Sequence, residues 1–211
     1  MLKLGTVSVG EYATNCYLLT CPETSQSLVV DPGGSAETVL ALCEGTHVTR
    51  VLLTHGHPDH VLGMNEVRDA LGAPVAVHPA DAAEFGIVAD FELRDGMRLR
   101  VGRHFVQVVH VPGHTPGSVA LRFGRRAIVG DAIFPGGPGR TDTSSALRTL
   151  LHSLERTIFT WPDDTCLYPG HGGSTSVGAE RLAFEEFLAR PRRPDLCGDV
   201  TWHPPDVGGG P

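Results

Sequence analysis

The stretch Thr54-His55-Gly56-His57-Pro58-Asp59-His60 follows the apolar run Val51-Leu52-Leu53 and places four potential metal-binding groups within six residues. On a β-strand His55 and His57 would share one face, because side chains repeat every two residues. The proline and aspartate that follow are typical of the first turn of a helix. The stretch therefore predicts a strand-to-helix turn that directs two imidazoles at one metal ion and the aspartate and last histidine at a second position nearby. Imidazole and carboxylate ligands suit zinc, iron or manganese.

Three further potential ligands, His114, Asp131 and His171, follow predicted strands in the second half of the chain. His114 lies in the Gly- and Pro-rich loop 111–118, whose backbone is tightly constrained. Asp131 directly follows the apolar strand 127–130, where a carboxylate needs a partner. Because ligands at the ends of separate strands can converge on one edge of a sheet, these three residues are candidates for the same site.

The rest of the chain alternates between predicted strands and predicted helices. The predicted strands cover residues 2–9, 15–20, 27–30, 50–53, 74–78 and 166–168, with a run of strands between 97 and 130. The predicted helices cover residues 36–43, 59–71, 80–85, 144–158 and 177–189. This order indicates an α/β protein with helices outside stacked sheets. We expect one domain over residues 1–197 and a loose Gly- and Pro-rich tail over residues 198–211.

The composition is that of a soluble globular protein. The chain has 211 residues, of which 41% are hydrophobic and 19% charged, and this length is sufficient for one sizeable core. A net charge of −7 argues against nucleic-acid binding through general phosphate attraction. We expect no membrane span, because no apolar run reaches membrane length. Five cysteines without a C-x-x-C pair favour free thiols in the cytoplasm.

The complete ligand series resembles that of the metallo-β-lactamase superfamily. It comprises His55-x-His57-x-Asp59-His60, His114, Asp131 and His171, in the same order, and the resemblance covers about residues 5–190. Several loops are similar to those of compact glyoxalase II-like (hydroxyacylglutathione hydrolase-like) members. These loops are Pro112–Ser118, Gly130–Phe134 with Gly139–Asp142, and Pro169–Gly172 with Ser174, Thr175, Glu180 and Arg181.

The resemblance implies an αββα sandwich, with two central mixed sheets flanked by helices, and a site for two divalent ions. The implied ligands are His55, His57 and His114 for metal one, Asp59, His60 and His171 for metal two, and Asp131 as the bridge. We expect both bound ions to be zinc, with iron and manganese as the alternatives. Asp59 and Asp131 are the candidate catalytic residues, with Asp59 also able to relay a proton.

The implied reaction is hydrolysis of a thioester to an acid and a thiol by a metal-bound hydroxide. The expected partner is a small acyl-thiol substrate, and the expected state is a monomer or small homo-oligomer. Arg140 is a candidate for binding a substrate carboxylate, or is a solvated loop arginine. His78 is a candidate for facing the substrate at the mouth of the site, or is structural.

Other functions are compatible with the same pattern. A persulfide dioxygenase of this fold would use one iron, held here by His55, His114 and Asp131. A lactone or other ester hydrolase would use the same dinuclear site. A non-catalytic module stabilised by metal is a further interpretation. Full-length glyoxalase II has an added C-terminal helical domain that forms much of its glutathione surface. This chain runs only about twenty residues past its last predicted helix, so the resemblance leaves the thiol carrier open.

Overall fold

Successive residues of the central strands face two different hydrophobic cores, which explains why these strands are continuously apolar in sequence. The structure is a computed structural model and describes residues 1–203. Leu28 and Val30 pack between the two sheets, whereas Val29 packs beneath the helices of the first half. Ile128 likewise faces the other sheet, and Val129 faces the helices of the second half. Side chains alternate across a strand, so a strand covered on both faces needs apolar residues at every position.

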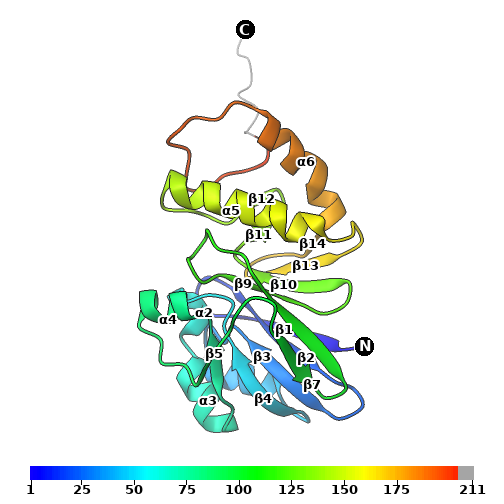
Figure 1. Cartoon of the computed structure of the whole chain (residues 1–211). Coiled ribbons are helices and arrows are strands. Elements are labelled where there is room, and N and C mark those ends of the chain that lie inside the picture. Colours follow the sequence, from blue (N-terminus) through cyan, green and yellow to red (C-terminus); the bar gives the residue numbers. More distant parts are fainter. Residues whose placement is uncertain (204–211) are drawn as a thin grey trace.

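Two six-stranded mixed sheets form the centre of the molecule (Figure 1). The first has the spatial order β1 (Lys3–Val9), β2 (Thr14–Thr20), β3 (Gln26–Val30), β4 (His47–Leu52), β5 (Val75–Val77), β6 (Phe91–Glu92). The second has the order β14 (Thr175–Ser176), β13 (Cys166–Pro169), β10 (Arg126–Gly130), β9 (Val119–Arg122), β8 (His104–His110), β7 (Arg98–Val101). A separate two-stranded ribbon joins β11 (Ile133–Phe134) to β12 (Gly137–Pro138).

Helices cover the outer face of each sheet. The first sheet carries α1 (Ala36–Leu42), α2 (Pro58–Val61), α3 (Met64–Leu71) and α4 (Pro79–Phe85). The second carries α5 (Ser144–Arg156), the 3-10 turn η1 (Ile158–Thr160) and α6 (Val177–Ala189). Two helical layers thus enclose two sheets (Figure 1), which confirms the predicted αββα sandwich.

Parallel strand pairs bring the predicted ligands to one edge of the sandwich. In the first sheet β3 and β4 run parallel, and in the second sheet β10 and β13 do so. Their carboxyl ends lead directly to Asp31, His55, Asp131 and His171 respectively. Parallel neighbours end at the same edge, so residues far apart in sequence become neighbours there.

The predicted helix over residues 59–71 is wrong as one element, because the chain forms two short helices, α2 and α3. They are separated at Gly63, whose backbone N–H donates to the carbonyl of Pro32 (2.9 Å). A Cβ on Gly63 would lie 2.2 Å from the carbonyl oxygen of Gly34. The turn after β3 therefore packs tightly against this position and interrupts the helix. The predicted end at Gly72 is confirmed, in a left-handed conformation.

The C-terminal segment, residues 198–203, packs on the body of the protein. Its first residue exchanges backbone hydrogen bonds with Thr141 (2.7 and 3.3 Å). Trp202 is fully buried against two phenylalanines of α6, and its indole N–H donates to Glu180 (2.8 Å). The prediction of a loose tail is therefore wrong for this segment, because Trp202 provides enough apolar surface to dock it. Residues 204–211 lie outside the described part of the chain.

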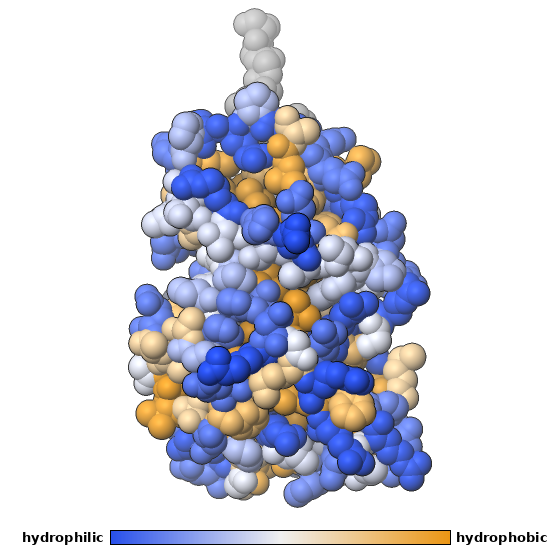
Figure 2. All heavy atoms as spheres, viewed as in Figure 1, coloured by the Kyte–Doolittle hydropathy of each residue, from blue (hydrophilic) through white to orange (hydrophobic). Residues whose placement is uncertain are grey.

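Among residues 1–203, no helix combines the length and apolar character needed to cross a membrane. Figure 2 shows that hydrophilic residues dominate the face in view, with hydrophobic residues scattered among them.

Candidate metal centre

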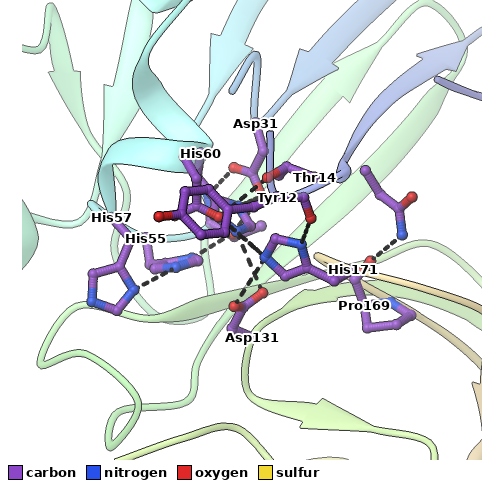
Figure 3. Close-up of polar contacts among 12 residues, drawn as sticks. Tyr12, Thr14, Asp31, His55, His57, His60, Asp131, Pro169 and His171 are labelled. Carbon is purple, nitrogen blue, oxygen red and sulfur yellow. Dashed lines mark hydrogen bonds and ion pairs between the residues drawn. The ribbon is translucent and has the colours of Figure 1, made fainter. Parts of the chain in front are cut away.

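The seven predicted ligands lie together at the edge of the sandwich where the two sheets meet. Figure 3 labels five of them, His55, His57, His60, Asp131 and His171. His55 and His57 come from the turn after β4, and α2 supplies Asp59 and His60. The second sheet supplies the other three, from the loop after β8 and from the ends of β10 and β13. Each half of the chain thus supplies part of the site.

The first group of donors consists of three imidazoles whose ring nitrogens converge. His57 Nδ1 lies 3.1 Å from His55 Nε2 and 2.9 Å from His114 Nε2. Ligands of a tetrahedral zinc ion with Zn–N bonds of about 2.0–2.1 Å lie about 3.3–3.4 Å apart, which is close to this spacing. His55, His57 and His114 are therefore arranged as predicted for metal one.

The second group consists of Asp59, His60 and His171. Asp59 Oδ2 lies 3.1 Å from His171 Nε2, and the Nε2 atoms of the two histidines are 3.3 Å apart. Thr14 donates to the same Asp59 oxygen (3.1 Å) and fixes its orientation. This is the arrangement predicted for metal two.

The outward-facing ring nitrogens show which imidazole nitrogens carry lone pairs into the site. The Nδ1 atoms of His114 and His171 donate to the backbone carbonyls of Arg140 (2.8 Å) and Tyr12 (3.0 Å). His60 Nδ1 donates in the same way to Asp31 Oδ2 (2.9 Å). A neutral imidazole that donates through one nitrogen has a lone pair on the other. In the neutral imidazoles the inward Nε2 atoms are therefore acceptors in close contact, an arrangement that a cation, whether a metal ion or a proton, stabilises.

Asp131 lies between the two groups. Its carboxylate oxygens are 3.4 Å from His60 Nε2, 3.5 Å from His171 Nε2 and 3.8 Å from His114 Nε2. Oδ1 is the oxygen that lies 3.4 Å from His60 Nε2; it is buried and accepts no hydrogen bond within residues 1–203. A buried carboxylate oxygen without a partner is costly, and a shared metal ion would satisfy it. The residues present therefore fit a dinuclear centre with Asp131 as the bridge.

The electrostatics of the second group and of Asp131 also favour positive charge. Burial lowers the pKa of His60, but Asp31 and Asp131 outweigh it and raise this pKa to about 10. Hydrogen bonds with Asp131 and Asp59 raise the pKa of His171 to about 10, and the His171 contact lowers that of Asp59 to about 2. Burial opposes ionisation of Asp131, yet His171 and His60 hold its pKa well below the usual range. Protons can therefore take the place of a cation at the second group, whereas burial lowers the pKa of His55 and of His57 in the first group.

Asp31 is a residue of the candidate site that the sequence analysis did not single out. It is fully buried, and its Oδ1 accepts the backbone N–H of Thr54 (2.7 Å). Its Oδ2 accepts the Thr54 hydroxyl (2.6 Å) as well as His60 Nδ1. These contacts place Asp31 to orient His60 and the turn that carries His55. A carboxylate directly after an apolar strand was the available signal, as for Asp131.

We expect Asp31→Asn to weaken metal binding by about 10–100-fold, the usual effect of losing a group that orients a ligand. The amide cannot accept from His60 and Thr54 as the carboxylate does, while asparagine tolerates the left-handed backbone of this position. Competition against a chelator of known affinity measures the change. Asp90→Asn is the matched control, because Asp90 also accepts a backbone N–H but lies in the β5–β6 loop. Unchanged affinity in Asp31→Asn would contradict the orienting role.

Asp81 is a second residue that the sequence reasoning missed. Its buried carboxylate accepts the backbone N–H of Gly56 (2.8 Å) and the hydroxyl of Thr115 (2.8 Å) on one oxygen, and the N–H of Gly117 (2.5 Å) on the other. It thereby joins the loop that carries His55 and His57 to the loop that carries His114. Its sequence context in a short helix contains no distinguishing signal.

Gly170 allows a close approach that no larger residue permits. A Cβ at this position would lie 2.1 Å from Asp131 Oδ1 and 2.5 Å from His60 Cε1. We expect Gly170→Ala to displace the bridging carboxylate and to lower metal affinity at least about tenfold. In Gly173→Ala the added Cβ meets no heavy atom within 4 Å, so this control should bind metal normally. Equal metal affinities of the two variants would show that the Asp131 position is not critical.

The two candidate substrate residues have other contacts. Arg140 donates to Asp142 (2.8 Å), and both side chains are exposed. His78 accepts the backbone N–H of Ala80 (3.2 Å) at the start of α4 and stacks on His110 at 4.2 Å. The structure therefore gives His78 a capping contact and does not bring it into the metal centre, while Arg140 reaches the centre through its carbonyl, which accepts from His114.

Comparison with known proteins identifies the family. Residues 9–178 match the metallo-beta-lactamase superfamily, and the chain belongs to it. Hydroxyacylglutathione hydrolase GloC of Haemophilus influenzae is 29% identical over 203 residues, which span 85% of this chain and 95% of that protein. Family and relative together support a metal-dependent hydrolase.

Two solved structures share the fold, with 34% and 30% sequence identity to this chain. A protein in a di-iron-bound form has a TM-score of 0.71 and 34% identity, with 84% of this chain and 96% of that chain covered. ETHE1 from Myxococcus xanthus has a TM-score of 0.74 and 30% identity, with 90% and 92% covered.

Proposed function

We propose that this chain is a dinuclear hydrolase that cleaves a thioester to an acid and a thiol. The observation that carries the proposal is the pair of three-donor groups on either side of Asp131, whose buried Oδ1 has no hydrogen-bond partner within residues 1–203. The similarity to a hydroxyacylglutathione hydrolase supports the thioester as substrate. A lactone or another ester would present the same carbonyl to the same residues.

The residues of the centre have distinct tasks. His55, His57 and His114 would hold one ion, and Asp59, His60 and His171 the other, with Asp131 shared. When bound, two such ions supply a nucleophile from water and polarise the substrate carbonyl. The Asp59 side chain is 23% exposed and can contact water at the site, whereas Asp131 at 12% is more enclosed. The thiol leaves readily as a thiolate because its pKa is low.

The described donors favour two ions over one. An iron held only by His55, His114 and Asp131 would leave the converging His57 Nδ1 without a role, although it lies 2.9 Å from His114 Nε2. It would also leave the complete second group unused. We therefore favour the hydrolase over the persulfide dioxygenase.

We further propose zinc as the first choice of metal and the cytoplasm as the site of action. Imidazole and carboxylate donors suit zinc, with iron and manganese as alternatives, and the relative in a di-iron-bound form supports iron as the second choice. All five cysteines are free, which suits a reducing compartment.

Metal removal tests the proposal directly. Protein purified without added metal should contain about two ions per chain and hydrolyse acyl thioesters. Dialysis against a chelator should abolish hydrolysis, and zinc, iron or manganese, added separately, should restore it. One iron per chain, together with oxygen uptake on a thiol persulfide and no thioester hydrolysis, would instead establish the dioxygenase.

A further inference from the structure

A groove with a volume of about 560 Å³ opens directly beside the first group of donors. Its walls come from α4, from the loop 112–116 and from the N-terminal half of α5, and His57 and His114 lie at its inner end. In Figure 1 two of the elements that form its walls, α4 and the beginning of α5, lie at the left. Grooves of this size hold ligands of several hundred daltons. A thioester reacting at the centre therefore has room here for its larger half.

Acidic and hydroxyl side chains dominate the polar lining of the groove. Glu84 and Asp142 contribute carboxylates, and Thr143, Ser145 and Thr149 contribute hydroxyls. No lysine or arginine lines the groove within residues 1–203. A carboxylate on the ligand would therefore meet like charges here, whereas hydroxyl and amide groups would find acceptors.

Phe85 adds an apolar surface at the inner end of the groove. Its ring packs edge-on against His57, with 5.3 Å between ring centroids, and closely over Gly56. An aromatic face beside carboxylates and hydroxyls is suited to an uncharged ligand with both apolar and hydroxyl surfaces.

Arg140 is a cation that could attract a ligand carboxylate and so offset its repulsion by Glu84 and Asp142. Its guanidinium donates to Asp142 at 2.8 Å, but both side chains are more than half exposed. Such an exposed ion pair is weak. A ligand carboxylate could in principle replace Asp142 as its partner, so the experiment must include this arginine.

We propose that the groove binds the thiol half of the substrate and selects an uncharged carrier with hydroxyl and amide groups over a carboxylate-bearing carrier such as glutathione. The proposal rests on the proposed thioester hydrolysis and specifies its substrate class. Like charges in the groove would exclude the wrong carrier, and hydrogen bonds to Glu84 and Asp142 would hold the right one.

The test compares two substrates that differ only in charge: N-acetyl-S-lactoylglutathione, which has two carboxylates and no ammonium group, and the same N-acetylated thioester with both carboxyls converted to amides, which is uncharged. With the metal-loaded protein we expect kcat/KM to be at least about tenfold higher for the diamide, a factor that corresponds to about 1.4 kcal/mol. The double variant Glu84→Gln with Asp142→Asn should reduce this preference. Glu185→Gln, on the exposed face of α6, is the control and should leave it unchanged.

Three results would separate the possibilities. Equal or faster hydrolysis of the glutathione ester, with a selective loss in Arg140→Gln, would overturn the proposal and identify Arg140 as the carboxylate partner. Hydrolysis of neither ester would contradict the proposed function. In that case the binding of free N-acetylglutathione and of its uncharged diamide to the metal-loaded protein is measured by calorimetry. Tighter binding of the diamide supports the selectivity of the groove, and equal or weaker binding overturns it.

Discussion

Asp131→Asn should reduce the metal content from about two ions per chain to at most one and slow hydrolysis by more than about 100-fold. The substitution keeps the shape of the side chain but removes the negative charge that both donor groups share. Asp131 lies within 3.8 Å of ring nitrogens from both groups, so no other described residue can take its place as a bridge. Elemental analysis and thioester hydrolysis of the same preparation measure the two effects together.

Asp164→Asn is the control for this experiment. Asp164 is exposed, pairs with Arg125 and lies outside the metal centre, so its substitution should change neither metal content nor rate. Asp131→Asn with two bound ions and normal activity would contradict the bridging role. If two ions remained but activity fell, Asp131 would act on the reaction without being needed for metal retention.

Trp202→Ala should lower the free energy of unfolding by about 3–5 kcal/mol, the usual cost of truncating a buried aromatic residue. Trp202 is fully buried and packs edge-on against Phe184 and Phe187, with ring centroids 5.4 and 5.6 Å away. Its loss also leaves Glu180 Oε2 without the indole donor. For a chain of this size the melting temperature should fall by roughly 2–4 °C per kcal/mol.

Leu182→Ala on the same helix is the control, because Leu182 is 67% exposed. Its effect should stay within about 0.5 kcal/mol. Denaturant-induced unfolding of both variants and of the parent protein measures the change in the free energy of unfolding. Similar stability of Trp202→Ala and the parent protein would show that the C-terminal segment adds nothing to the core.

The sequence was sufficient to predict the fold and to identify seven candidate ligands at one edge of it. Each of these residues follows a strand or begins a helix, so the apolar pattern that predicts the strand also predicts the position of the ligand. Convergence then follows from parallel pairing, as at β10 and β13. Their role as metal ligands stays a prediction, for which the buried Oδ1 of Asp131 is the strongest structural support.

The residues that orient the ligands were harder to predict, because their partners are distant in sequence. Asp81 contacts Gly117, and Asp31 contacts His60, through hydrogen bonds that no local pattern reveals. The break between α2 and α3 at Gly63 has a similar origin, since it depends on a contact with the turn after β3. The docking of Trp202 has a similar origin, because the two phenylalanines that it packs against belong to α6.

The attachment of the C-terminal segment has a practical consequence for handling the protein. Thr141, which exchanges backbone hydrogen bonds with Gly198, follows Arg140, and the carbonyl of Arg140 orients His114. Strain applied at this end of the chain can therefore reach an imidazole of the metal centre through a few bonded contacts. An affinity tag is better placed before Met1, which is exposed at the opposite terminus, so that the measured metal content reflects the native loop.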